Sequence, residues 1–368
     1  MTMDPIEQQL REILMDFDEF SNDLIQGRIV QFAPPFDAYL SHTGDIISYL
    51  HDFFHTYVDR VNAMQCLDAV NSTMKSIVEK YRHDNNITNA PAVSFDLLAE
   101  TRSVCNMILD CLSRYFKGFP ADAFEEMEKA MTDKGCHLLN LLPQIHYEKG
   151  SPDLYRVRKD VHDNALNLFH VPFEMRQKCD TYRFSIAGVP ALYCGATLKT
   201  AMLETNISLG DEFSAAIFSY KKDYLSAFVD LTIPKRKDYG FWERYSLILF
   251  YPLIVACGLK VKDPSAPFKP EYVIPQLFYQ LLRNHSSGFD GIIFNSSKYR
   301  VRDFADHRQS NYVIFTRQCD AESGYCTELA NKLTVKGPKS FKYDSEEDIV
   351  AAADSLRSSD SGTVATVA

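Results

Sequence analysis

The sequence lacks several features that would assign it to a specialised class of protein. None of its nine cysteines forms a Cys-x-x-Cys pair and their number is odd, so neither a disulfide framework nor a zinc ribbon is expected. There is no long basic run and the formal net charge is −10, which argues against a dedicated nucleic-acid or membrane-surface binder. The N-terminal stretch MTMDPIEQQLREI lacks the basic and apolar regions of a secretory signal.

A long uninterrupted apolar run is also missing. The most apolar window, residues 245–259, contains Pro252 and Gly258 and is shorter than the roughly 20 apolar residues that a membrane span needs. We therefore expect this window to be a buried helix or strand. Free thiols in a reducing compartment explain the cysteines most simply, so we expect a cytoplasmic protein. A length of 368 residues allows two domains, or one domain with a large extension.

Residues 1–148 have the pattern of a helical domain. Apolar residues recur at helical spacing over residues 4–25, and the same pattern predicts helices over 46–61, 67–81, 97–116 and 121–130. His51 and His55 have the i, i+4 spacing of metal ligands. A zinc site needs at least three protein ligands and no third one lies nearby in the sequence, so we expect no metal site.

From residue 149 the pattern changes to strands alternating with helices, which predicts a mixed α/β domain over residues 149–320 and an α+β chain overall. Strands are expected at 154–158, 191–194, 215–220, 226–231, 289–296 and 311–316, and helices at 199–207 and 276–284. Residues 327–368 end in a segment rich in Ser and Asp and poor in aromatic residues. We expect this tail to be disordered.

Five polar side chains in the second domain point to chemistry if one cleft gathers them: Arg156, Arg183, Glu204, and the adjacent Ser296 and Ser297. The rigid donor fork of an arginine suits a pyrophosphate. A lone carboxylate can hold ribose hydroxyls and stabilise positive charge that builds on a sugar carbon, while a serine can orient the ribose or an amide. NAD has all of these groups, and its nicotinamide is a good leaving group.

Two aromatic residues, Tyr193 and Phe294, are candidates to stack on a flat ring of the ligand. Every one of these residues also has an ordinary structural explanation. Glu204 alone fits a solvated helix residue, the arginines and serines fit the ends and edges of strands, and the aromatic residues fit a core. Spacing by itself leaves both explanations open.

Four segments between Leu154 and Thr316 resemble, in the same order, those of the RES domain family, which is named for its Arg, Glu and Ser. They are LYRVR, YRFSIAGVPALYCGATLKTAMLE, YVIPQLFYQLLRNHSSGFDGIIFNSS and NYVIF. In this resemblance Arg156 matches the first-strand arginine, Arg183 the second arginine, Glu204 the acid, and Ser296 the serine, with Ser297 as the alternative.

The resemblance implies a fold like that of the diphtheria-toxin-type ADP-ribosyltransferases. It also implies that NAD is consumed as a substrate, without a cofactor, by hydrolysis, phosphorolysis or transfer of ADP-ribose. Family members often act as bacterial toxins restrained by an antitoxin, so the implied partners are NAD and an antitoxin or regulatory protein. The helical region before residue 149 is similar to an extension found before some bacterial RES domains.

Two other functions remain open. Arg156 and His162 have the Arg-x5-His spacing of HEPN-type ribonucleases, although that motif needs a helix and LYRVR predicts a strand. The site could also bind a nucleotide or a partner without catalysis, because Ser185 stands where the family often has Asn or Asp. Following NAD over time separates these functions.

Overall fold

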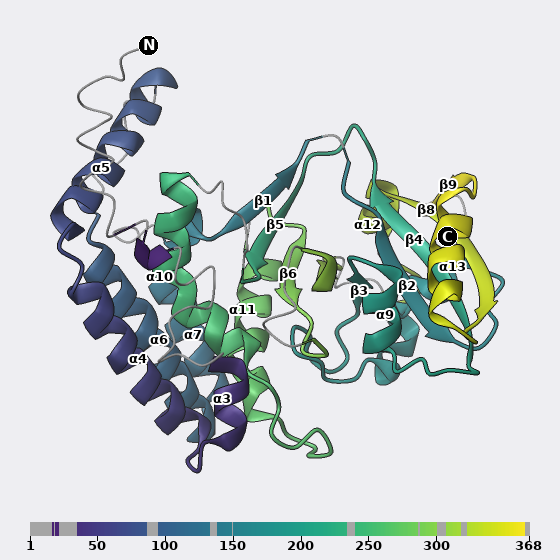
Figure 1. Cartoon of the computed structure of the whole chain (residues 1–368), viewed down its shortest axis with the longest axis horizontal. Helices are drawn as coiled ribbons and strands as arrows, with labels where there is room; N and C mark the ends of the chain where they lie inside the picture. The colour runs from purple at the N-terminus through teal and green to yellow at the C-terminus, as the bar shows by residue number, and fades with distance from the viewer. Residues whose placement is uncertain are drawn as a thin grey trace. The chain divides into compact units, whose positions relative to one another are not determined.

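The computed structural model describes residues 17, 19–21, 35–86, 95–132, 138–148, 150–233, 240–285, 288–299, 307–317 and 322–364. The chain divides into two compact units. We call Met1–Pro143 together with Lys235–Leu277 the helical unit, and Gln144–Pro234 together with Phe278–Ala368 the sheet unit. Figure 1 labels most of the elements of both.

The described helices of the helical unit include those predicted over 46–61, 67–81, 97–116 and 121–130, and others, over 35–41 and 138–141, that the pattern did not predict. They are α3 (Pro35–Ser41), α4 (Ile46–Asn62), α5 (Leu67–Asp84), α6 (Leu97–Phe116), α7 (Pro120–Thr132), α8 (Leu138–Leu141) and α10 (Phe241–Gly258). The side chains of Asp45 and Asp96 cap α4 and α6 by accepting hydrogen bonds from backbone N–H groups, which explains where these helices begin. The helix predicted over residues 4–25 lies outside the described residues except at 17 and 19–21, which are helical.

The apolar window at residues 245–259 forms most of α10, and every residue from Arg244 to Cys257 is buried. A helix that is apolar on all sides belongs in a core. Two hydrogen bonds tie it to other helices of the unit: Tyr245 Oη donates to Glu100 Oε2 at 2.7 Å, and Tyr57 Oη donates to the Ile248 carbonyl at 2.7 Å. The sequence predicted residues 149–320 as one domain, whereas contacts place 235–277 with the N-terminal helices. None of the helices in the described ranges is long and apolar enough to cross a bilayer.

The described part of the sheet unit contains nine strands. They are β1 (Gln144–Tyr147), β2 (Leu154–Lys159), β3 (Ala191–Gly195), β4 (Glu212–Tyr220), β5 (Ser226–Leu231), β6 (Gly291–Asn295), β7 (Ser310–Phe315), β8 (Leu333–Lys342) and β9 (Ser361–Thr363). Their order in the sheet is β1-β5-β6-β7-β3-β2-β4-β8-β9. Only β5 and β6 run parallel among these paired strands. The predicted α+β class is confirmed.

Helices and short 3₁₀ turns connect the strands. They are η1 (Ala165–Leu168), η2 (Phe173–Lys178), α9 (Leu198–Glu204), η3 (Pro270–Tyr272), α11 (Val273–Asn284), η5 (His307–Gln309), α12 (Thr327–Lys332) and α13 (Glu346–Arg357). The yellow C-terminal elements α13 and β8 lie beside β4 in Figure 1.

Two neighbouring strands of the sheet, β2 and β3, are paired over only a short length. Strands β2 and β3 lie entirely within the described range 150–233 and share one registered pair, Tyr155 with Gly195. In contrast, β2 pairs with β4 along its whole length, and β3 does so with β7. The sheet therefore consists of two parts that meet at this pair and diverge beyond it, and Arg156 is the next residue along β2.

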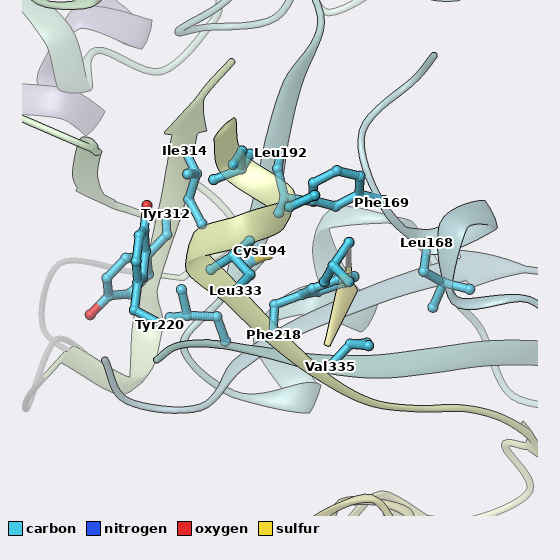
Figure 2. Close-up of a cluster of buried hydrophobic side chains, with 14 of the residues drawn as sticks. Leu168, Phe169, Leu192, Cys194, Phe218, Tyr220, Tyr312, Ile314, Leu333 and Val335 are labelled. Carbon is cyan, nitrogen blue, oxygen red and sulfur yellow. The ribbon is translucent and has the colours of Figure 1, made fainter. Parts of the chain in front are cut away.

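A shared core holds the two parts together. Figure 2 shows Leu192, Tyr312 and Ile314 from one part near Phe218 and Tyr220 from the other. A second cluster of buried residues includes α9 and α13 with residues of β2 and β4. Packing through these clusters fixes the relation of β3 to β2 where few main-chain hydrogen bonds do so.

The prediction of a disordered tail is wrong for the described residues, because the segment forms α12, β8, α13 and β9. Its polar residues have structural roles: Ser345 caps α13, and the Asp348 carboxylate accepts a hydrogen bond from the Ser345 N–H at 2.7 Å. This reciprocal arrangement is a capping box. Buried Ile349, Ala352 and Leu356 recur at helical spacing on the same helix.

Candidate active site

Glu204 is the last residue of α9, and the chain ends the helix there in a defined way. Asn206 adopts a left-handed conformation with φ of 53°. The Ile207 N–H donates to the Met202 carbonyl at 3.0 Å, and the Asn206 N–H donates to the Leu203 carbonyl at 3.2 Å. These two bonds are those of a Schellman motif, so the backbone at Glu204 is held firmly.

Gly195 lets α9 approach β3. A Cβ atom at this position would lie 2.6 Å from the Ala201 nitrogen and 3.0 Å from the Thr197 oxygen, which is closer than real contacts allow. The helix begins at once beyond this glycine, with the Thr197 hydroxyl accepting a hydrogen bond from the Thr200 N–H at 3.1 Å. The strand, the glycine and the cap together set the position of Glu204.

The Glu204 carboxylate receives two short hydrogen bonds on one oxygen. Ser296 Oγ donates to Oε1 at 2.5 Å and Asn311 Nδ2 donates to the same atom at 2.6 Å. Within the described ranges Oε2 accepts no hydrogen bond. The side chain is only partly buried. A negative charge is disfavoured at the C-terminus of a helix, so both donors also offset an unfavourable placement.

The structure distinguishes the two adjacent serines. Ser296 is fully buried, its N–H continues the strand ladder to the Gln309 carbonyl at 2.9 Å, and its hydroxyl contacts Glu204. Ser297 is exposed in the turn that follows. The contact with the acid favours Ser296 as the serine of the motif.

Asn311, the first residue of the segment NYVIF, was not among the predicted site residues. It lies on β7, is 5% exposed, and contributes one of the two donors to Glu204. Asn is depleted in strands, so an Asn at the start of a buried strand was a usable signal. We treat it as a further member of the candidate site.

Arg156 lies where the two parts of the sheet diverge. Its Nη1 donates to the Tyr193 carbonyl at 2.9 Å, so the side chain bridges β2 and β3 beyond their last registered pair. Burial lowers the pKa of the Arg156 guanidinium, which nonetheless stays charged at neutral pH. Successive residues of a strand point to opposite faces, so Arg156 leaves β2 on the side opposite Tyr155.

Gly195 of β3 lies between the strand that carries Arg156 and the strand that carries Asn311, the donor to Glu204. Gly195 pairs with Tyr155, which precedes Arg156, on one side and with Asn311 on the other. Arg156 and Glu204 form no ion pair with each other in the part of the chain that the structure describes. Neither side chain therefore compensates the charge of the other by direct contact.

Arg183 lies in a tight turn in which the Ser185 N–H donates to the Tyr182 carbonyl at 3.3 Å. The arginine is 9% exposed. The ring of Phe184, the next residue, packs against Phe294 with centroids 4.7 Å apart. This contact fixes the turn against the end of β6, the strand that leads to Ser296.

The predicted turn before Pro190 is present. Gly188 has φ of 78° and the Val189 N–H donates to the Ile186 carbonyl at 3.0 Å. The positive φ requires a residue such as glycine at this position. The turn returns the chain from Arg183 to β3.

The two candidate stacking residues each have an aromatic neighbour. Phe294 pairs in register with Asn311 and packs on Phe184, while the ring of Tyr193 meets that of Tyr182 edge-on at 5.7 Å. Both side chains are partly buried. Their stacking on a ligand stays a prediction.

Cys194 and His162 can be assigned no catalytic part. Burial raises the pKa of the Cys194 thiol to about 12, so the reactive thiolate is scarce at neutral pH. His162 lies in the loop after β2, and its Nε2 is 3.0 Å from the Lys159 carbonyl. Arg156 is on a strand, so the helical arrangement of a HEPN ribonuclease motif is absent at these two described residues.

Comparisons of the sequence with known proteins gave two matches. The family model described as the RES domain matches residues 153–330. The chain is also similar to a Bacillus subtilis (strain 168) protein named "Putative toxin YopC", with 24% identity over 329 residues that cover 82% of this chain and 72% of that protein. No solved structure matches the chain significantly. Residues 153–330 are therefore similar to a RES domain, and described helices precede them.

Proposed function

We propose that this protein consumes NAD by cleaving the bond between nicotinamide and ribose. The observation that carries the proposal is the state of Glu204. Its Oε1 is fixed by Ser296 and Asn311, whereas Oε2 accepts no hydrogen bond from any residue that the structure describes. An oriented carboxylate with one uncommitted oxygen is suited to a ribose hydroxyl and to positive charge on the ribose.

The proposed reaction needs no general acid. When the bond between ribose C1′ and the pyridinium nitrogen breaks, both bonding electrons leave with nicotinamide, which becomes neutral. Positive charge then develops on the ribose, and the Glu204 carboxylate stabilises it more in the transition state than in the substrate. Water, phosphate or an acceptor group adds to C1′, and an incoming group that carries a proton releases it.

The remaining candidate residues have supporting roles in this proposal. Arg156 and Arg183 contact the diphosphate, because guanidinium groups match phosphate oxygens in geometry and charge. Ser297 contacts the ribose. Tyr193 and Phe294 lie against the rings of the dinucleotide.

We further propose that the protein acts as a bacterial toxin or defence effector in the cytoplasm, where NAD is present, and that an antitoxin or regulatory protein restrains it. The support is the RES domain together with a relative that is itself named a toxin. Induced expression in a bacterial host should lower cellular NAD and stop growth. Equal growth arrest by a folded Glu204→Gln variant would contradict this proposal.

The direct test is incubation of the purified full chain with NAD, with and without phosphate, followed by identification of all products. Free nicotinamide with ADP-ribose indicates hydrolysis, a phosphorylated ADP-ribose that needs added phosphate indicates phosphorolysis, and a modified protein indicates transfer. NAD that binds but stays intact would contradict cleavage and support a binding protein instead.

A further inference from the structure

A second arginine, Arg158, lies beside Arg156 and has no counter-charge among the described residues. Arg158 is two residues further along β2, so its side chain leaves the strand on the same face as that of Arg156. Positions two apart on a strand are separated by roughly 7 Å. Both side chains are partly buried, and neither forms an ion pair with a carboxylate among the residues that the structure describes.

Most N–H donors of Arg156 and Arg158 have no hydrogen-bond acceptor among the described residues. The Nε atoms of Arg156 and Arg158 are buried and have no hydrogen-bond partner in the part of the chain that the structure describes. Arg156 donates one hydrogen bond, to the Tyr193 carbonyl, and Arg158 donates none within the described ranges. An arginine has five N–H donors, so most of this donor capacity is uncommitted.

The surroundings favour an anion. Burial lowers the pKa of both guanidinium groups, and the charge of Arg156 lowers that of Arg158 further. Both effects disfavour the charged guanidinium groups, and a bound anion would offset them. Tyr182 and Tyr325 are close enough to Arg158 to interact with it electrostatically.

We infer that Arg158 joins Arg156 in a two-arginine subsite for the diphosphate of the dinucleotide substrate. The inference rests on the proposed function for the identity of the ligand, whereas the anion site itself rests on the paired arginines. Two guanidinium forks on one strand face can bind adjacent phosphate groups. The assignment adds a residue outside the Arg, Glu and Ser of the family name.

The test measures binding to the full chain by titration calorimetry. The probes are inorganic pyrophosphate, ADP-ribose, inorganic phosphate and nicotinamide riboside, which lacks the diphosphate. The variants are Arg158→Gln, Arg158→Lys and the control Lys159→Gln. Lys159 is the neighbouring exposed residue of β2 and pairs with Asp211 at 3.1 Å, so its loss removes the same charge from a different face.

Arg158→Gln should weaken the binding of pyrophosphate and ADP-ribose at least tenfold, because charge-assisted hydrogen bonds are lost. It should leave nicotinamide riboside binding within about twofold and raise the KM for NAD more than it lowers kcat. Arg158→Lys should recover only part of the affinity, since an ammonium lacks the planar fork. The control should bind every probe as the wild type does.

Several results would overturn the inference. They are unchanged pyrophosphate binding in a folded Arg158→Gln or Arg158→Lys variant, an equal loss with Lys159→Gln, and wild-type binding of inorganic phosphate as tight as that of ADP-ribose. If NAD stays intact but pyrophosphate binding depends on Arg158, the subsite stands and the proposed cleavage fails. If NAD is cleaved and Arg158 is indifferent to both anions, cleavage stands and the subsite fails.

Discussion

Replacing Glu204 with glutamine is the sharpest perturbation of the candidate site, because it preserves shape and removes charge. The amide oxygen of glutamine can take the place of Oε1 and keep accepting from Ser296 and Asn311, which lie 2.5 and 2.6 Å from it. The amide NH₂ then occupies the place of Oε2. The variant therefore loses one negative charge and one uncommitted acceptor while the surrounding contacts remain.

The changes in stability and in kcat can each be estimated. Each of the two hydrogen bonds changes from charged to neutral and weakens by about 1 kcal/mol, so the fold should lose about 2 kcal/mol of stability. Catalysis should suffer more, because removing one preorganised electrostatic group lowers kcat by about 10² to 10³, or about 2.7–4 kcal/mol. KM should rise by a smaller factor than kcat falls, since the contact with the ribose hydroxyl is present in the bound substrate whereas the stabilisation of charge belongs to the transition state.

The assay is nicotinamide release over a range of NAD concentrations, with thermal melting to confirm folding. Glu212→Gln is the matched control, because Glu212 is an exposed acid at the start of β4 in the same unit. Wild-type kcat in folded Glu204→Gln would remove the carboxylate from the mechanism. A loss as large in Glu212→Gln would show that general charge, not position, is responsible.

Other predictions test the support around the site and the helical unit. Asn311→Ala removes one of two donors to Glu204 and should lower kcat at least tenfold, on the order of one charged hydrogen bond; unchanged kcat would contradict its positioning role. Gly195→Ala should displace α9, since the added Cβ would lie 2.6 Å from the Ala201 nitrogen, and should lower kcat at a stability cost of about 1–3 kcal/mol; wild-type kinetics and melting would refute this. Burial raises the pKa of Glu100 from 4.5 to about 7. The contribution of Glu100 to the free energy of unfolding is therefore full below pH 4.5 and lost as pH rises through 7. That shift in pKa corresponds to about 3 kcal/mol, so wild-type protein should be less stable at pH 8 than at pH 5 by about this amount. Urea unfolding of Glu100→Gln should show no such difference between pH 5 and pH 8. A fragment of residues 149–368 should aggregate, because it exposes α10; a monodisperse, folded fragment on size-exclusion chromatography would refute that expectation.

Local pattern was sufficient for the helices α4 to α7 and for the strands β2 to β7. Helix α6 begins and ends at the predicted residues, and β5 matches its predicted range, because helical spacing, caps and β-branched runs are encoded within a few residues. The motif also placed Glu204 beside Ser296, which the structure joins through a hydrogen bond. That contact joins positions 92 residues apart in the chain, and only the order of the matched segments indicated it.

What the sequence could not reveal depends on tertiary context. Asn311 acts through a contact made possible by the pairing of β7 with β3 and β6. The C-terminal segment is polar in composition, yet β8 finds a partner along β4 and α13 buries one narrow face. The average composition of the segment indicates neither β8 nor α13, because the pairing with a distant strand and the helix cap each depend on a few specific residues.

The inserted segment 235–277 changes how the helical unit must be regarded. It lies between β5 and β6, which are parallel neighbours, and a connection between parallel strands has to cross over, usually through a helix. Here the crossover supplies α10, whose buried stretch from Arg244 to Cys257 belongs to the core of the helical unit. The N-terminal helices therefore complete a core that includes α10, which lies inside the segment that matches the RES domain model. Removing these helices would expose the apolar surface of a connection that β6, and with it Ser296, requires.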